Sequence, residues 1–337
     1  MRQAILYGAG DLRLEERPLD AAALEPDQVY VETAVSALST GTDLGNYLGD
    51  STYVPGALNY PRPVGYSNVG VVERVGTGVR RWAPGDRLFS LKPHQSAYVA
   101  REDELLVRVP EGVSSEAASL AYLTHLGLAA LRQAGYASGE NVAVIGLGVI
   151  GLCTVGLARA MGAKVAGLAN SELRAQTALA VGADTALLAS DPELDTKLAA
   201  LFGESGIDIA VLTANPWDAY RVAVRVVRYG GRVSILGFPG RGEPAPDFNP
   251  LDPRWFYAKQ LTLFGAGYAP RADCPPSEIR FNTRRNLEYI LELMRRRLLR
   301  LEALVTHRFP AARMQEAYEL ARGHSKDLVA AVFDWSA

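Results

Sequence analysis

The stretch that decides the fold is NVAVIGLGVIGLCTVGLARAMGAKVAGLA, residues 141–169. Its apolar start, Val142 to Ile145, is typical of a strand that is buried on both faces of a parallel sheet. The glycine turn GLGVIG follows at 146–151, and then a helix is expected to about Met161 and a second strand over Lys164 to Leu168. This order predicts a βαβ unit that binds a dinucleotide, with an accidental glycine-rich turn as the alternative.

The first residues of this helix form the predicted phosphate site. Gly146 permits the tight reversal, Gly148 lets the backbone approach a pyrophosphate, and Gly151 lets the helix pack close to the strand. The helix starts with Val149 and Ile150, so its unpaired N–H groups and the positive end of its dipole point at the phosphate. The phosphate is therefore expected to bind mainly to backbone groups.

The end of the second strand distinguishes the two nicotinamide dinucleotides. Turns that bind NAD usually carry Asp or Glu there, which binds the ribose 2′-hydroxyl. Here Ala169 takes that place, and Asn170, Ser171 and Arg174 follow. Neutral donors and one guanidinium favour a 2′-phosphate, so we predict NADP(H), with NAD(H) as the alternative. Ser171 can instead cap the next helix, with Arg174 in its solvated first turn.

Length and composition limit the class of protein. With 337 residues the chain is long enough for two domains. Its net charge of −2 gives no electrostatic reason to expect binding to nucleic acid or an anionic membrane. It has no run of about 18 apolar residues and begins with a strand-like segment, so we expect a soluble, cytoplasmic protein. The two cysteines, Cys153 and Cys274, match no metal or disulfide pattern.

Hydrophobic periodicity divides the rest of the chain. Strand-like runs and turns alternate up to about Val113, and Gln28 to Ser36 has Val29, Val31, Thr33 and Val35 on one face. A helix that Ser114 or Ser115 can cap continues to about Ala134. Strands and helices then alternate, which predicts a doubly wound parallel sheet. Near the end, a helix is predicted with an apolar stripe formed by Leu287, Ile290, Leu291, Met294 and Leu298.

These motifs, in this order, resemble the medium-chain dehydrogenase/reductase superfamily. The matching segments outside the glycine turn are GYSNVGVVERVGTG at 65–78, APGDR at 83–87, VPEGV at 109–113, GGRVSILG at 230–237 and VTHRFPAARMQEA at 305–317. The resemblance implies a Rossmann domain, residues 125–269, inserted in a β-rich GroES-like catalytic domain, residues 1–124 and 270–337, with the substrate cleft between them. It also implies a homodimer that acts on a small-molecule substrate.

The chain departs from the zinc-dependent members of the superfamily. They carry a Cys-Gly-Thr-Asp type of segment and Gly-His-Glu, whereas this chain has TGTD at 40–43 and GYS at 65–67. Thr40 and Tyr66 thus replace two ligands with groups that bind zinc poorly, and His125, roughly at the third position, cannot make a site alone. We therefore predict no metal. The two segments are similar to those of the zinc-free bacteriochlorophyllide a dehydrogenase and threonine-dehydrogenase-like groups.

Without zinc, hydrogen-bond donors must polarise the substrate oxygen. The resemblance places Thr42 where a hydroxyl relays a proton and Tyr66 near the reacting carbon, and Tyr66 is our first choice as general acid/base. Asp43 is expected to orient neighbouring groups, and Ser67 either polarises the substrate oxygen or binds backbone. The remaining candidates are His125, His94, Tyr47 and Tyr53 for catalysis and Thr40 for cofactor binding.

The predicted function is hydride transfer between NADP(H) and a carbonyl/alcohol pair. The alternative is an enoyl or quinone reductase, because an activated C=C bond depends less on a Lewis acid. A second alternative is a non-catalytic, nucleotide-binding member of the fold.

Overall fold

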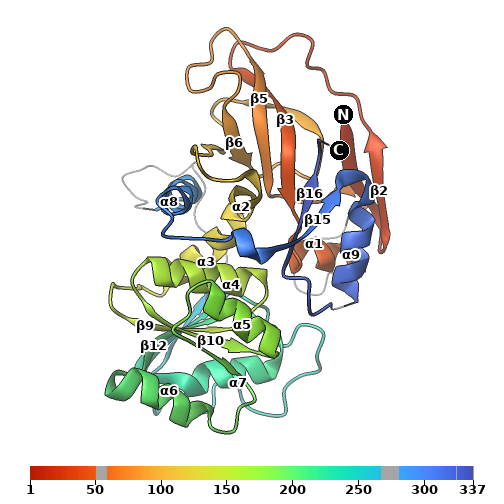
Figure 1. Cartoon of the computed structure of the whole chain (residues 1–337). Coiled ribbons are helices and arrows are strands. Elements are labelled where there is room, and N and C mark those ends of the chain that lie inside the picture. Colours follow the sequence, from red (N-terminus) through yellow and green to blue (C-terminus); the bar gives the residue numbers. More distant parts are fainter. Residues whose placement is uncertain (51–58, 267–280, 324, 337) are drawn as a thin grey trace. The chain divides into compact units, whose positions relative to one another are not determined.

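The computed structural model describes residues 1–50, 59–266, 281–323 and 325–336, so Tyr53 and Cys274 lie outside the described residues. The chain forms two compact units (Figure 1). The first unit contains the described residues of Met1–Tyr122, Arg271–Arg297 and Glu302–Ala337. The second contains those of Leu123–Pro270 and Leu298–Leu301. The chain thus leaves the first unit and later returns to it.

The second unit is built on a six-stranded sheet with the order β11-β10-β9-β12-β13-β14. All its pairs are parallel, and this is the 3-2-1-4-5-6 order of a Rossmann fold. Helices α4 and α5 lie on one face of the sheet and α6 and α7 on the other (Figure 1). The strands are β9 (Asn141–Ile145), β10 (Lys164–Ala169), β11 (Thr185–Leu188), β12 (Ile207–Leu212), β13 (Val227–Ile235) and β14 (Thr262–Gly265). The helices are α3 (Ala121–Gln133), whose first two residues belong to the first unit, α4 (Val149–Ala160), α5 (Glu172–Ala180), α6 (Leu194–Phe202), η1 (Gly203–Ser205) and α7 (Trp217–Val226).

The central strand β9 shows why this sheet forms. Val142 to Ile145 are all buried, because helices cover both faces of the sheet. Ala143 and Ile145 face a core that includes Phe202 of α6 and Tyr220 of α7. Burying each large apolar side chain stabilises the fold by about 1.5 to 3 kcal/mol.

The first unit is rich in antiparallel strands, with a seven-stranded sheet in the order β15-β16-β3-β5-β6-β8, in which β7 also pairs with β3, and a three-stranded sheet β2-β1-β4. The C-terminal strand β16 pairs antiparallel with β3, which closes the unit after the chain returns. Its strands are β1 (Arg2–Gly8), β2 (Asp11–Glu16), β3 (Gln28–Ala37), β4 (Arg62–Pro63), β5 (Asn68–Val75), β6 (Arg87–Ser90), β7 (Ala97–Arg101), β8 (Leu106–Arg108), β15 (Val305–Pro310) and β16 (Ala330–Asp334). Its helices are α1 (Thr42–Leu48), α2 (Ser115–Ser119), α8 (Thr283–Arg295), η2 (Glu302–Leu304), η3 (Ala311–Arg313) and α9 (Met314–Arg322). The predicted class, a Rossmann sheet combined with a β-rich domain, is confirmed.

Three local predictions need correction. The register of β3 against β5 shifts between Thr33 and Val35, so Val35 is only half-buried and Ser36 is buried instead. The helix predicted from Ser114 is interrupted at Leu120 and forms α2 and α3, although the Ser114 Oγ does accept the cap hydrogen bond from the Ala117 N–H at 3.1 Å. Leu298 is 50% exposed because α8 ends at Arg295.

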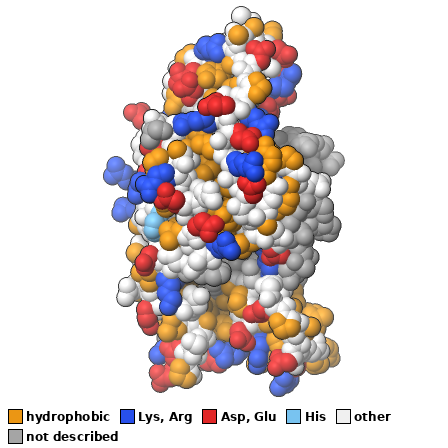
Figure 2. Space-filling model, turned by 90° about the vertical axis from the view of Figure 1, so that its right-hand side faces the viewer, with side chains coloured by type: hydrophobic (Ala, Val, Ile, Leu, Met, Phe, Trp, Pro, Cys, Tyr) orange, Lys and Arg blue, Asp and Glu red, His pale blue; other side chains and the backbone are white. Residues whose placement is uncertain are grey.

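The surface shows no accumulation of one charge on the face drawn in Figure 2, where Lys and Arg are interspersed with Asp and Glu. This agrees with the small net charge of the chain. Across the described residues, no helix combines the length and the apolar character that crossing a membrane requires.

Candidate functional site

The glycine turn after β9 is shaped by close contacts on one side and open space on the other. A Cβ at Gly151 would lie 1.9 Å from the carbonyl oxygen of Gly146, so only glycine fits there. Gly146 itself has a φ of +92°, which favours glycine. A Cβ at Gly148, in contrast, would meet nothing within 4 Å. The structure thus leaves free the one position where a pyrophosphate is expected to approach the backbone.

The N-terminus of α4 faces this turn. Gly148 is its N-cap residue and provides no side-chain cap, and no acidic residue lies in the first turn. The first N–H groups, beginning with those of Val149 and Ile150, have no acceptor within the helix and carry the positive end of its dipole. These residues therefore fit a dinucleotide phosphate.

The turn is supported by Thr213, which follows β12. The Thr213 Oγ1 donates a hydrogen bond to the Gly146 carbonyl oxygen at 2.6 Å. Thr213 was not predicted, because its only signal in the sequence is its place after the strand that neighbours β9 in the Rossmann order. Thr213 holds the turn in shape and does not itself provide a phosphate ligand.

The segment after β10 contains the candidate 2′-phosphate residues. Ala169 ends β10 and is buried, Asn170 is exposed, and Arg174 lies half-buried in the first turn of α5. Ser171 is the N-cap residue of α5 but makes no side-chain cap hydrogen bond, so the capping alternative is not what the structure shows. Glu172, whose carboxylate is exposed, begins the helix and adds a negative charge next to Ser171.

In the first unit, a cluster of hydroxyl groups surrounds Tyr66. The phenol of Tyr66 donates a hydrogen bond to the Ser39 Oγ at 2.5 Å and also hydrogen-bonds with the hydroxyl of Thr42, the first residue of α1. The Tyr122 ring contacts Tyr66 edge to face, with the ring centroids 5.4 Å apart. Ser39 was not among the predicted site residues, although it directly precedes the TGTD segment. We call Ser39, Thr42, Asp43, Gly65 and Tyr66 the Tyr66 cluster.

The carboxylate of Asp43 joins the two segments of the Tyr66 cluster. It is buried, its Oδ2 accepts from the Ser39 N–H at 3.0 Å, and its Oδ1 accepts from the Gly65 N–H at 3.2 Å. Burial, and then the negative charge of Asp43, raise the pKa of Tyr66 well above its usual value. The phenol is therefore neutral at physiological pH and acts as a hydrogen-bond donor, while its use as a phenolate base is disfavoured.

The other predicted catalytic residues have different surroundings. The Ser67 Oγ donates to the Ser119 carbonyl oxygen at 2.6 Å, so this hydroxyl binds backbone. Tyr47 donates to Glu319, and burial together with that carboxylate raises the pKa of Tyr47 to about 12. His125 is buried on α3 in the second unit, and burial, with the charge of Arg132, lowers the pKa of His125 to about 4.

Thr40 completes the predicted set, and Cys153, which matches no metal or disulfide pattern, is also described. Thr40 is half-buried and lies in the first unit, directly before the N-cap residue of α1. Cys153 is buried in α4, and burial raises the pKa of this thiol to about 12, so it behaves as a core side chain. Thr42, Asp43 and Tyr66 are thus the predicted catalytic residues that the structure brings together.

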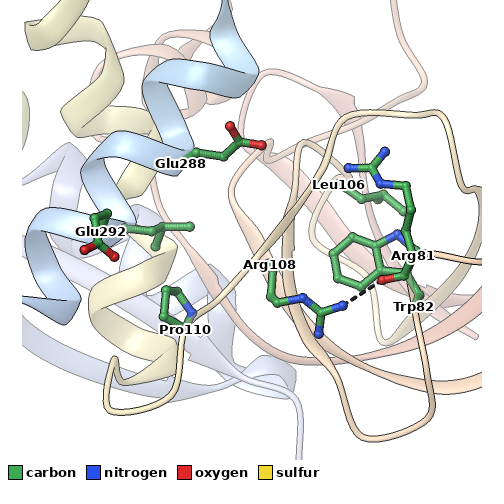
Figure 3. A pocket seen from close by; sticks show the side chains of 8 residues that line it. Arg81, Trp82, Leu106, Arg108, Pro110, Glu288 and Glu292 are labelled. Atoms are coloured by element: carbon green, nitrogen blue, oxygen red, sulfur yellow. Dashed lines mark hydrogen bonds between the residues drawn. The ribbon is translucent and has the colours of Figure 1, made fainter.

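A separate cavity in the first unit is lined by none of the predicted catalytic or cofactor-binding residues. It measures about 190 Å³ and lies between α8 and the strand ends near Trp82 and Arg108 (Figure 3). The Arg108 guanidinium stacks on Trp82 and donates to the Arg81 carbonyl oxygen at 2.7 Å, while Glu292 pairs with Arg295. The charged groups of Arg108 and Glu292 are thus already engaged with the protein.

The Tyr66 cluster does not fit a catalytic zinc ion. The resemblance places Thr40 and Tyr66 where zinc-dependent members have thiolate and imidazole ligands, and the Tyr66 phenol hydrogen-bonds with neighbouring hydroxyl groups. Neutral hydroxyl oxygens bind zinc poorly compared with thiolate or imidazole. Within the described parts of the chain, no group of three or more His, Cys, Asp or Glu residues is placed to hold a metal ion.

Comparison with known proteins agrees with this architecture. The family model for zinc-binding dehydrogenases matches residues 149–282. Sorbitol dehydrogenase from Gallus gallus is 24% identical, covering 94% of this chain and 92% of the relative. L-threonine 3-dehydrogenase from Anaeromyxobacter dehalogenans (strain 2CP-C) is 26% identical, covering 91% of each chain.

Solved structures show the same fold over nearly the whole chain. A protein from Sinorhizobium meliloti 1021 classed as a zinc-binding dehydrogenase, bound to NADP, superimposes with a TM-score of 0.76 at 19% identity, covering 99% of this chain and 98% of that one. A short chain alcohol dehydrogenase from Escherichia coli CFT073, complexed with NADH, gives a TM-score of 0.78 at 18% identity, covering 99% of each chain. Together with the order of its motifs, these findings show that the chain is similar over nearly its whole length to dehydrogenases of the medium-chain dehydrogenase/reductase superfamily.

Proposed function

We propose that this protein transfers hydride between NADP(H) and a carbonyl/alcohol substrate without a catalytic zinc ion. The observation that supports the proposal is the Tyr66 cluster, in which a neutral phenol, at a position where the resemblance implies a metal ligand, hydrogen-bonds with the hydroxyls of Ser39 and Thr42. The names of the relatives, sorbitol and threonine dehydrogenases, support an alcohol or polyol as the substrate.

The residues of the second unit support a nicotinamide dinucleotide. Gly148 borders open space, and the N-terminus of α4 is available to phosphate oxygens. Arg174, with Asn170 and Ser171, gives the segment after β10 one cation and two neutral donors, which favours the 2′-phosphate of NADP(H). Glu172 opposes this preference if its carboxylate turns toward the ribose, so the choice of cofactor needs a direct measurement.

The chemistry assigned to the protein is hydrogen bonding to the substrate oxygen. A bound nicotinamide supplies or accepts the hydride. In the proposed step the single phenol proton of Tyr66, which this structure directs at the Ser39 Oγ, turns to the substrate oxygen on which negative charge develops. A well-aimed donor of this kind stabilises the transition state by about 3 to 4 kcal/mol. The Ser39 and Thr42 hydroxyls are the groups through which a proton reaches or leaves the phenol.

The direct test is a matched substrate screen. Purified protein is incubated with NADPH or NADH and pairs of ketones and enones of equal size, and with polyols in the oxidative direction. Oxidation of NADPH by ketones, retained after dialysis against a chelator, supports the proposal. Turnover of enones alone would instead identify an enoyl or quinone reductase, and cofactor binding without turnover a non-catalytic member. Stoichiometric zinc that turnover requires would overturn the metal-free mechanism.

We also propose that the protein is a homodimer, as the superfamily resemblance implies. Light scattering coupled to size-exclusion chromatography measures the molar mass directly. A mass near twice 36.3 kDa is the expected result, and a monomer at micromolar concentration contradicts the proposal.

A further inference from the structure

A buried histidine lies behind the Tyr66 cluster. His94 has no exposed surface, and its Nδ1 is 2.8 Å from the Ser36 Oγ, which accepts a hydrogen bond from the Trp335 Nε1 at 2.9 Å. Its Nε2 is buried, has no hydrogen-bond partner among the described residues, and lies 3.8 Å from the Asp43 Oδ2. The edge-to-face contact with Phe333, with centroids 4.9 Å apart, fixes the ring further.

The neighbours of His94 determine its tautomer. Ser36 already accepts the proton of the Trp335 indole, so its own hydroxyl proton is free to be donated to the Nδ1 of His94. The Nε2 then carries the proton, which faces the carboxylate of Asp43. The other neutral tautomer would direct the Nε2 lone pair at that carboxylate, which is electrostatically unfavourable.

His94 also fixes the backbone before Tyr66. Gly65 has a φ of +89°, and a Cβ there would lie 2.5 Å from the imidazole ring. The ring therefore packs directly against Gly65, whose N–H donates to Asp43. Asp43 also accepts from the N–H of Ser39, the hydrogen-bond partner of the phenol. His94 thus contacts Gly65, one of the two residues that the Asp43 carboxylate joins, and also faces that carboxylate.

We propose that His94 is a positioning residue, which in its Nε2–H form orients Asp43 and thereby holds Ser39 and Tyr66 in hydrogen-bonding geometry. It acts through Asp43 and does not contact the substrate. Its effect on turnover rests on the proposed function of Tyr66, whereas its effect on the geometry of the cluster does not.

The test compares three substitutions of His94. In His94→Gln the amide N–H reaches the place of Nε2, in His94→Asn an amide reaches only the place of Nδ1, and His94→Phe keeps the ring without either nitrogen. Tyrosine labelled with ¹³C at Cζ reports on Tyr66, whose NMR signal is the one absent from Tyr66→Phe. Amide exchange of Ser39 and Gly65 reports on the two hydrogen bonds to Asp43.

We expect His94→Gln to preserve the hydrogen bonds of the Tyr66 cluster and His94→Asn to lose them. The Asn and Phe variants should shift the Tyr66 signal, raise amide exchange at Ser39 and Gly65 about tenfold, and lower kcat about tenfold with an unchanged KM for NADPH. In the Gln variant, amide exchange at Ser39 and Gly65 and kcat should each stay within about threefold of the parent value. Asp43, Tyr122 and Tyr318 stay unchanged in all variants, because these titratable groups face Tyr66 and affect the charge around the cluster.

The outcomes separate this proposal from the proposed function. If no substrate is turned over but Gln alone preserves the NMR signal and the amide protection, the positioning role holds and the enzymatic assignment fails. If Asn and Gln behave alike, or Phe leaves the Tyr66 signal and kcat unchanged, His94 only fills space and the proposal is wrong. Should Phe fail to fold, as circular dichroism would show, the comparison of Asn with Gln decides alone.

Discussion

The glycine turn and the Tyr66 cluster are two sites built on different principles. At the turn, backbone groups form the expected phosphate site, since Gly146 and Gly151 are in close contact and Gly148 borders open space. In the cluster, side chains form the site, and the carboxylate of Asp43 bridges the backbone of two segments that are distant in sequence. The turn is thus common to many dinucleotide-binding folds, whereas the cluster is the site to which the proposed chemistry is assigned.

Each unit also holds one titratable side chain neutral, mainly by burial, and the neighbouring charge that adds to this effect has the opposite sign in the two units. In the first unit, burial and the negative Asp43 raise the pKa of Tyr66. In the second unit, burial and the positive Arg132 lower the pKa of His125. A neutral phenol keeps the proton that it donates to a carbonyl oxygen, which suits Tyr66 to that role. A neutral histidine in the second unit fits a structural position.

The largest expected effect is that of Tyr66→Phe, which removes the donor but keeps the ring. We expect kcat with a ketone to fall about 100-fold, because one well-placed donor stabilises the developing charge by several kcal/mol. The Kd for NADPH should not change. The matched control is Tyr98→Phe, a buried phenol of the same unit whose hydroxyl is bonded to Ser90. Equal losses in both variants would show that the effect is structural and would remove Tyr66 from the mechanism.

A pair of glycine variants tests whether the turn separates stability from binding. Gly151→Ala places a Cβ 1.9 Å from the Gly146 oxygen and should lower the free energy of unfolding by about 2 kcal/mol. Gly148→Ala meets no atom within 4 Å and should leave stability unchanged within about 0.5 kcal/mol. It should nevertheless weaken NADPH binding about tenfold, because its methyl group occupies the expected phosphate position. Urea denaturation and cofactor titration measure both quantities. Unaltered affinity in Gly148→Ala would mean that phosphate does not approach this glycine.

Substitutions after β10 test the choice of cofactor. Arg174→Gln removes the one cation, and we expect the preference for NADPH over NADH to fall about tenfold, the loss of one charge-assisted hydrogen bond. Glu172→Gln is the matched change of opposite sign and should raise NADPH affinity slightly. Titration of each variant with both dinucleotides provides the ratio. A parent protein that binds NADH as tightly as NADPH contradicts the prediction before any variant is made.

The difference between the two sites also explains what the sequence could predict. The βαβ unit was predictable because the apolar run at 142–145 and the glycine spacing are local signals. The roles of Ser39 and His94 were not, because they depend on the bridge that Asp43 forms to Gly65, a residue 22 positions away. The register shift in β3 and the interruption of the helix at Leu120 could not be predicted for a similar reason. A strand register and a helix end depend on the neighbouring elements in the fold.

The smallest expected effect concerns pH and the second unit. Because the pKa of His125 is about 4 in the folded protein and about 6.5 in an unfolded chain, the unfolded state binds the proton more readily between these values. The stabilising contribution of a neutral His125 is therefore complete above about pH 6.5 and is lost as the pH falls toward 4. Between pH 7.5 and 5.5 this loss amounts to about 1 kcal/mol, which the non-titrating variant His125→Gln should not show. Urea denaturation at both pH values measures the difference between parent and variant. The same loss of stability in acid for both proteins would mean that His125 is not held neutral by its surroundings, and the contrast between the two units would then rest on Tyr66 alone.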